Sequence, residues 1–132
     1  MRSTLARFLI AVAGLAACSA PMFAHHGSRI SYDLTRMVTL TGTVTEFQWQ
    51  NPHVYITFDV KDKEGNVTHW GAETYSPVVM TRSGWGRRTL KTGDKVTITV
   101  WPSKIGTPLG FLAKVVHPDG HVTDLSKGGG PK

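Results

Sequence analysis

From residue 37 onward, apolar and polar residues alternate, which is the period of a β-strand with one buried face. The apolar residues of the first half share one face: Val38, Leu40 and Val44. Phe47 and Trp49 fall on the opposite phase, and a phase change within one strand predicts a bulge or a sharp coil. We therefore expect a long first strand that bends midway and ends at Asn51–Pro52.

Four more stretches alternate in the same way. They are "HVYITFDV" (53–60), "VTHWGAETY" (67–75), "KVTITVW" (95–101) and "FLAKVVH" (111–117). Gly65–Asn66 predicts a hairpin turn between the second and third strands. Ser76–Pro77 predicts the start of a helix of about two turns, which ends near Gly84 or Gly86. A "PDG" turn then leads into a short "HVTDL" segment.

This order predicts an all-β domain over residues 37–125. Five strands with a short helix between the third and the fourth is the order of an OB-fold, a small Greek-key barrel. A first strand that bends suits this barrel because it must serve both of its sides. A β-sandwich of similar size remains the alternative. We expect residues 25–36 to form a flexible arm and residues 126–132 a disordered tail.

The first 24 residues have the pattern of an export signal. "MRSTLAR" is basic, "FLIAVAGLAAC" is apolar but too short for a permanent membrane span, and small residues follow. Cleavage after Ala24 would make His25 the new amino terminus, although Met22 then stands at position −3, where a small residue is preferred. The alternative is a lipoprotein signal over residues 1–17, because "LAACS" resembles a lipobox with Cys18 as the lipidated residue. Both sites direct the protein to a bacterial periplasm, and only the second adds a membrane anchor.

Composition narrows the function classes. Residues 1–24 hold two arginines and no acid, so the formal charge of +6 falls to about +4 in the exported chain. An exported chain rarely meets nucleic acid, so this charge favours solubility or contact with anionic envelope surfaces. The single cysteine is lost or lipidated, which leaves no disulfide in the domain. No nucleophile and base stand in a catalytic pattern, and we expect no enzymatic activity.

Histidines carry the leading functional hypothesis. Imidazole suits copper, zinc and nickel. The free amine and the ring of His25 would chelate one ion together, and His26 or His53 would add a further nitrogen, an arrangement that copper favours. His53 follows the Asn51–Pro52 corner and points away from the apolar face of its strand. His69 lies with Glu73 on the polar face of the third strand.

The aromatic residues support an alternative hypothesis of another class. Tyr55 and Trp101 fall opposite the apolar face of their strands, and with Trp70 they would bind a partner protein, a glycan or a small envelope ligand without any metal. The remaining charged and polar candidates are interpreted as surface residues: His117, His121, Arg82, Arg87 and Arg88.

Several stretches of the chain also resemble a known family. They are "AHH" after the signal, "LTGTVTEFQWQNPH", "WGAE", "SGW" followed by "LKTGDKVTI", and a late "DG" turn. Together they are similar to a set of small exported bacterial proteins that is classed as a domain of unknown function. This resemblance implies an exported, β-barrel-like domain and carries no activity. Members of that set more often have Ala-x-Ala before the histidines, whereas this chain has Met22 and the lipobox-like Cys18.

Overall fold

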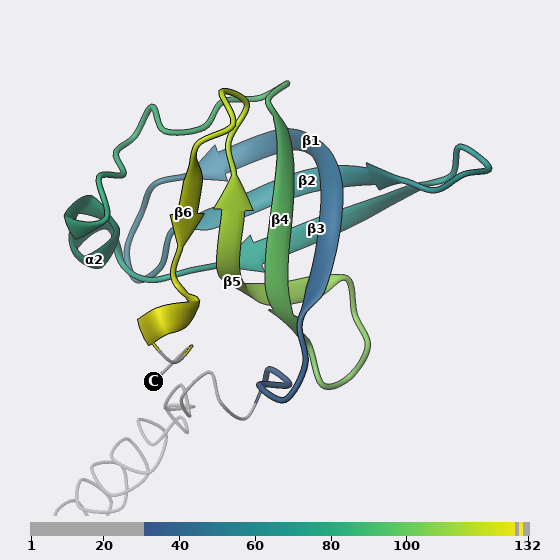
Figure 1. Ribbon diagram of the computed structural model, residues 1–132, viewed down its shortest axis with the longest axis horizontal. Coiled ribbons are helices and arrows are strands. Elements are labelled where there is room, and N and C mark those ends of the chain that lie inside the picture. The colour runs from purple at the N-terminus through teal and green to yellow at the C-terminus, as the bar shows by residue number, and fades with distance from the viewer. Residues whose placement is uncertain (1–30, 129, 131–132) are drawn as a thin grey trace, which may run out of the picture.

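The computed structural model describes residues 31–128 and 130, and Figure 1 shows its elements. The strands are β1 (Val38–Gln48), β2 (Tyr55–Lys61), β3 (Val67–Glu73), β4 (Lys95–Pro102), β5 (Leu109–Val116) and β6 (Val122–Asp124). One helix, α2 (Pro77–Arg82), lies between β3 and β4, and a 3-10 helix, η1 (Ser126–Gly128), follows β6. The predicted order of elements is confirmed, with β6 in the "HVTDL" segment.

The strands close into a five-stranded barrel. The sheet has the order β3-β2-β1-β4-β5-β6, and β3 also pairs with β5. That pairing is parallel, with Gly71 opposite Leu109 and Ala72 opposite Gly110, whereas the pairings between the other neighbours in the sheet are antiparallel. This closed, mixed barrel with a helix between β3 and β4 confirms the predicted OB-like fold.

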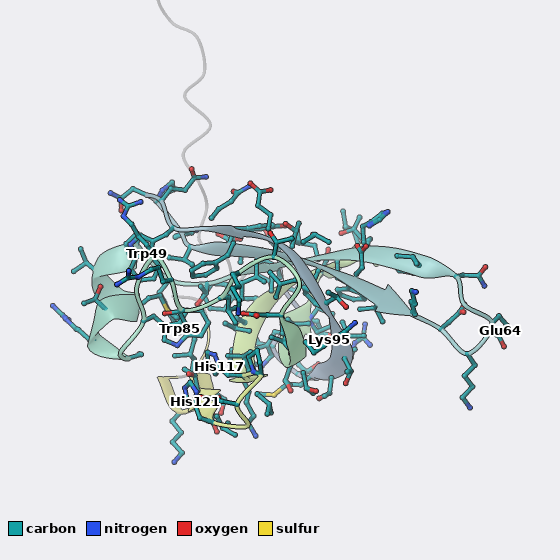
Figure 2. The ribbon with its side chains drawn as sticks, turned by 90° about the horizontal axis from the view of Figure 1, so that it is seen from above. Trp49, Glu64, Trp85, Lys95, His117 and His121 are labelled. Carbon is teal, nitrogen blue, oxygen red and sulfur yellow. The ribbon has the colours of Figure 1, made fainter. Side chains whose placement is uncertain are left out.

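β1 bends where the sequence pattern changes phase. Its pairing with β2 shifts register between Val44 and Glu46, which is the predicted bulge. The bulge lets the first half of β1 pair with β4 and the second half with β2. Beyond the barrel, β2 and β3 continue as a long hairpin whose tip carries Glu64, far from the helix in both views (Figures 1 and 2).

The interior holds one main core and one smaller cluster. The main core comprises Val44, Val54, Ile56, Phe58, Ala72, Met80, Trp85, Leu90, Val96, Ile98, Val100, Leu112 and Val115. Inward residues of β2 and β4 therefore match their predicted faces. α2 begins at Pro77 as expected and buries Met80 in this core, although the Ser76 side chain makes no capping bond. The smaller cluster joins Tyr32, Trp101, Phe111 and Ala113.

The described part of the N-terminal arm, residues 31–36, packs against the barrel. Tyr32 is only 2% exposed and forms a β-bridge with Ser103. The Asp33 amide donates to the carbonyl of Pro102 at 2.8 Å, and the Lys104 amide donates to the carbonyl of Ser31 at 3.0 Å. The expected flexible arm is thus wrong for these residues, because Tyr32 has an apolar cluster to enter.

The C-terminal segment is also more ordered than expected. Residues 126–128 form η1, and the carbonyl of Gly130 accepts a hydrogen bond of 2.9 Å from the Tyr75 hydroxyl. Gly130 is buried beside Leu34 and Trp101. The predicted disordered tail is therefore wrong for the described residues of 126–132. The alternation pattern misses this docking because the glycines provide no apolar side chain. Over the described part of the chain, no helix has the length and apolar character needed to cross a membrane.

Candidate metal-binding site

The outer face of the β2–β3 hairpin carries a row of polar side chains. The sheet register places Tyr55 opposite Glu73 and Asp59 opposite His69. His53 lies just before β2, and its neighbour Val54 exchanges backbone hydrogen bonds with the segment after β3, so His53 stands beside Glu73. The alternation that turns Ile56 and Phe58 into the core therefore turns His53, Tyr55 and Glu73 outward.

Glu73 joins two side chains that are far from it in sequence. Its Oε1 is hydrogen-bonded to Nδ1 of His53, and its Oε2 accepts a hydrogen bond of 2.5 Å from the Tyr32 hydroxyl. The Glu73 side chain is 23% exposed and the His53 side chain is 41% exposed. One carboxylate thus connects the barrel corner to the N-terminal arm.

These contacts determine which nitrogen of His53 is available. A carboxylate oxygen only accepts hydrogen bonds, so Nδ1 of His53 carries the proton that it shares with Glu73. A neutral His53 ring must then present the lone pair of Nε2 to its surroundings. Metal-binding histidines commonly have one ring nitrogen hydrogen-bonded to a carboxylate in this way.

An open pocket of about 390 Å³ lies at His53. Its lining residues are Gln48, Gln50, Pro52, His53, Tyr55 and Glu73. The Tyr55 hydroxyl lies over Gly71, where a Cβ atom would come within 2.0 Å of it, so only glycine leaves room for this ring. Burial and the negative charge of Glu73 raise the pKa of Tyr55. The pKa of Tyr32 is raised strongly by burial and by its hydrogen bond to Glu73, so its hydroxyl stays protonated as the donor.

The other predicted metal ligands are not brought together in the described residues. His25 and His26 lie outside the described part of the chain. His69 lies on the same face of β3 as Glu73, as expected, but four residues away from it on the exposed hairpin, where its Nδ1 is hydrogen-bonded to Asp59 at 2.6 Å. Within residues 31–128 and 130, no three histidine, cysteine or acidic side chains gather as a metal-ligand set.

The aromatic candidates have different surroundings. Tyr55 lines the pocket at His53, and Trp70 is half-buried against the main core. Trp101 does point away from that core, but its expected exposure is wrong, because it is only 5% exposed. The arm brings Tyr32 beside β4 and β5, and Trp101 packs with Tyr32 and Phe111 in the smaller cluster.

His117 and His121 form a second histidine group near α2. Their rings stack with centroids 3.8 Å apart, and the His117 ring meets Trp85 edge-on at 5.4 Å (Figure 2). His117 Nε2 and Trp85 Nε1 both lie 3.0 Å from the Thr123 hydroxyl oxygen. The predicted surface position of His117 is wrong, because β6 covers it and leaves it 5% exposed, whereas His121 is exposed as expected.

The arginines after β3 are exposed, as predicted. Arg87 donates to the backbone carbonyl of Trp49 at 3.4 Å, and Figure 2 shows Trp49 above Trp85 at this end of the molecule. In the part of the chain that the structure describes, Arg82 and Arg88 are not arranged as an anion-binding site.

Two site residues escaped the sequence analysis. The sequence analysis puts Glu73 on the polar face of its strand without a partner, but counting outward from the 62–66 turn puts it opposite Tyr55 and next to His53, so the signal was present. Tyr32 had no such signal, because its contact with Glu73 depends on how the arm crosses β4 and β5.

Fold and site together define a small closed β-barrel of the OB type with a tyrosine–glutamate–histidine group on its outer face. The chain belongs to a family of unknown function, DUF6152, whose match covers residues 11–112. This confirms the resemblance to a domain of unknown function. A search of the curated proteins gave no match.

One solved structure, titled "Crystal structure of the ZRD-deleted mutant of TiaS in complex with agmatine", is similar with a TM-score of 0.42 and 22% identity. The match covers 62% of this chain and 21% of that one, so the chain spans about a fifth of its length.

Proposed function

We propose that this protein is an exported, non-catalytic protein of the bacterial periplasm that binds copper through His25, His26 and His53. The observation that carries the proposal is the hydrogen bond between Nδ1 of His53 and Glu73. It orients the imidazole and leaves Nε2 free at an open pocket, which is how proteins prepare a histidine to bind a metal ion.

The position of the arm supports the participation of the N-terminal histidines. Tyr32 reaches Glu73, the same carboxylate that holds His53. Tyr32 is the seventh residue after His25, and seven residues of chain span at most about 25 Å. A terminal amine and the rings of His25 and His26 are therefore within reach of His53.

Copper is the metal that this set of donors favours. The proposed ligands are an amine and imidazole nitrogens, and no thiolate remains in the chain once Cys18 is removed. Nitrogen donors bind Cu(II) more tightly than the other divalent first-row ions. An ion held in this way would sit beside Tyr55 and the Gln48 and Gln50 side chains that line the pocket.

The test is a Cu(II) titration of the mature protein beginning at His25, followed by electron spin resonance. We expect one tight site with nitrogen couplings. His53→Ala should change the spectrum and weaken binding by at least about tenfold, because it removes a ligand.

His69→Ala is the matched control. His69 is likewise a strand histidine bonded to a carboxylate, but it lies about 13 Å along β3 from Glu73. This variant should match the wild type. One extra residue before His25 would remove the terminal chelate and should weaken binding. A spectrum that neither His53→Ala nor His25→Ala changes would refute the proposal.

A metal-free interaction module is the alternative. It keeps Tyr55 and, in part, Trp70, but it loses Trp101 because that ring is buried. If copper fails to bind the wild type, the outer face around Tyr55 becomes the surface to test against envelope partners.

A further inference from the structure

We propose that Tyr32 couples docking of the N-terminal arm to the metal-binding competence of His53, so that arm docking and copper binding strengthen each other. This inference rests on the proposed function and adds a regulatory partner to the same site, namely the arm of the chain itself.

The first step is that the arm docks through contacts independent of His53. Two backbone hydrogen bonds tie the arm to the barrel: Ser31 to Lys104, just after β4, at 3.0 Å, and Asp33 to Pro102, at the end of β4, at 2.8 Å. The Tyr32 ring enters the smaller cluster, with its centroid 5.8 Å from that of Phe111. In Figure 1 the arm lies beside the loop that joins β4 to β5. Because the backbone bonds of Ser31 and Asp33 flank Tyr32 on both sides, we take these contacts to dock and leave as one unit.

The second step is that the Tyr32 hydroxyl shares Glu73 with His53. The two oxygens of Glu73 are divided between them, Oε2 to Tyr32 and Oε1 to His53. With Tyr32 in place, the carboxylate is held from one side and directs its other oxygen at Nδ1 of His53. When the arm leaves, Glu73 loses this restraint and its partly exposed side chain can rotate toward water.

The third step is thermodynamic reciprocity. If the docked arm raises the affinity of the site for copper by some factor, copper must favour the docked arm by the same factor. Partners that orient metal-binding histidines typically change metal affinity by about 10–100-fold. An effect of about tenfold on both equilibria is therefore the expected scale.

The first measurement examines the hydrogen bonds between Tyr32, Glu73 and His53 in the absence of metal. Nitrogen NMR of the His53 ring should report a proton on Nδ1 in the mature wild type. Glu73→Gln and the conservative Tyr32→Phe should shift this signal, because each removes one of the hydrogen bonds that link Tyr32, Glu73 and His53. Tyr75→Phe is the matched control: it also removes a tyrosine hydrogen bond near Phe111, but to Gly130 instead of Glu73, and should leave the His53 signal unchanged.

The second measurement adds Cu(II). Hydrogen exchange of peptides spanning residues 31–36, read by mass spectrometry, should slow by about tenfold in the wild type when copper saturates the site. In Tyr32→Phe, copper should bind about tenfold more weakly, and copper should no longer slow exchange in the arm. Tyr75→Phe should behave as the wild type in both respects.

The outcomes separate the two proposals. If copper binds the wild type but arm exchange stays unchanged, the coupling is overturned and the metal site stands. If Tyr32→Phe binds copper as tightly as the wild type, the coupling is likewise overturned. A wild type that binds no copper overturns both, and the copper-free NMR signal then decides whether the Tyr32–Glu73–His53 chain exists.

Discussion

At the residue scale, the same side-chain type has opposite roles in two places. His53 is partly exposed and its Nδ1 is hydrogen-bonded to the Glu73 carboxylate, so its Nε2 remains available. His117 is buried, and its Nε2 is satisfied by the hydroxyl of Thr123, which also accepts from Trp85. A neutral His117 can accept the hydroxyl proton of Thr123, so this group holds β5, β6 and the segment after α2 together.

The environment of His117 predicts a pH-dependent stability. Burial, followed by the nearby His121, lowers the pKa of His117 below its usual value of 6.5, although Asp119 and Asp94 oppose the shift. The unfolded chain therefore binds the proton more readily than the folded one. The contribution of neutral His117 to the free energy of unfolding should therefore be fully present above pH 6.5. It should decrease as the pH drops below 6.5 toward the lower pKa of the folded state.

Urea unfolding measured between pH 5 and 8 tests this prediction. His117→Gln should lower stability at neutral pH and flatten the dependence on pH, because the group responsible is gone. His69→Gln controls for the loss of an exposed histidine and should keep the wild-type slope. A His117→Gln slope equal to that of the wild type would contradict the argument.

At the element scale, the barrel depends on the short parallel contact between β3 and β5. Only three residue pairs form it, from Gly71 with Leu109 to Glu73 with Phe111. Gly110 lies in this seam and also against β4. A Cβ atom there would come within 2.5 Å of Val100 Cβ and 2.9 Å of the Trp101 carbonyl oxygen. Glycine thus permits the close approach that closes the barrel.

Gly110→Ala should lower the free energy of unfolding by about 1–3 kcal/mol, the usual cost of overpacking a close-packed site. Gly86→Ala is the control, because a Cβ atom at Gly86 meets nothing within 4 Å. It should leave stability unchanged or raise it slightly. Denaturant unfolding of both variants decides the matter, and equal midpoints would show that the seam tolerates a methyl group.

At the scale of the whole molecule, the barrel presents its candidate site where the arm arrives. The smaller cluster collects the arm, β4, β5 and the C-terminal Gly130 on one side of the barrel. The protruding hairpin is the continuation of β2 and β3 beyond the barrel, on the side away from α2 (Figure 1). This arrangement places the start of the described chain near the pocket at His53.

Under the proposed function, processing of the export signal decides which nitrogens the site receives. The proposed terminal chelate requires a mature protein with the intact mass of residues 25–132, because only cleavage after Ala24 frees the amine of His25. Mass spectrometry of protein purified from the envelope measures this directly. A diacylated Cys18 would instead remove the terminal chelate and leave only side-chain imidazoles. The site would then bind copper more weakly than proposed.

Much of the fold was predictable because it depends on local alternation. Inward residues such as Ile56, Phe58 and Ile98 occupy their expected faces, and the phase change in β1 marks its bulge. His53 was predictable as an outward residue on the same grounds. Trp101 and His117 were not, because strand phase states which way a side chain points and leaves open what covers it.

The sequence by itself determined the order of the strands along the chain and the outward direction of His53, since both follow from residues that are neighbours along the chain, whereas the pairing of β3 with β5 decided for a barrel over a β-sandwich. Only the tertiary structure decided that Tyr32 meets Glu73, that Trp101 is buried and that β6 covers His117. Tyr32 and Glu73 are 41 residues apart in the sequence, and Trp101 packs with the same distant Tyr32, so no local period records these contacts. They arise when the barrel closes and the arm finds an apolar surface on which to pack.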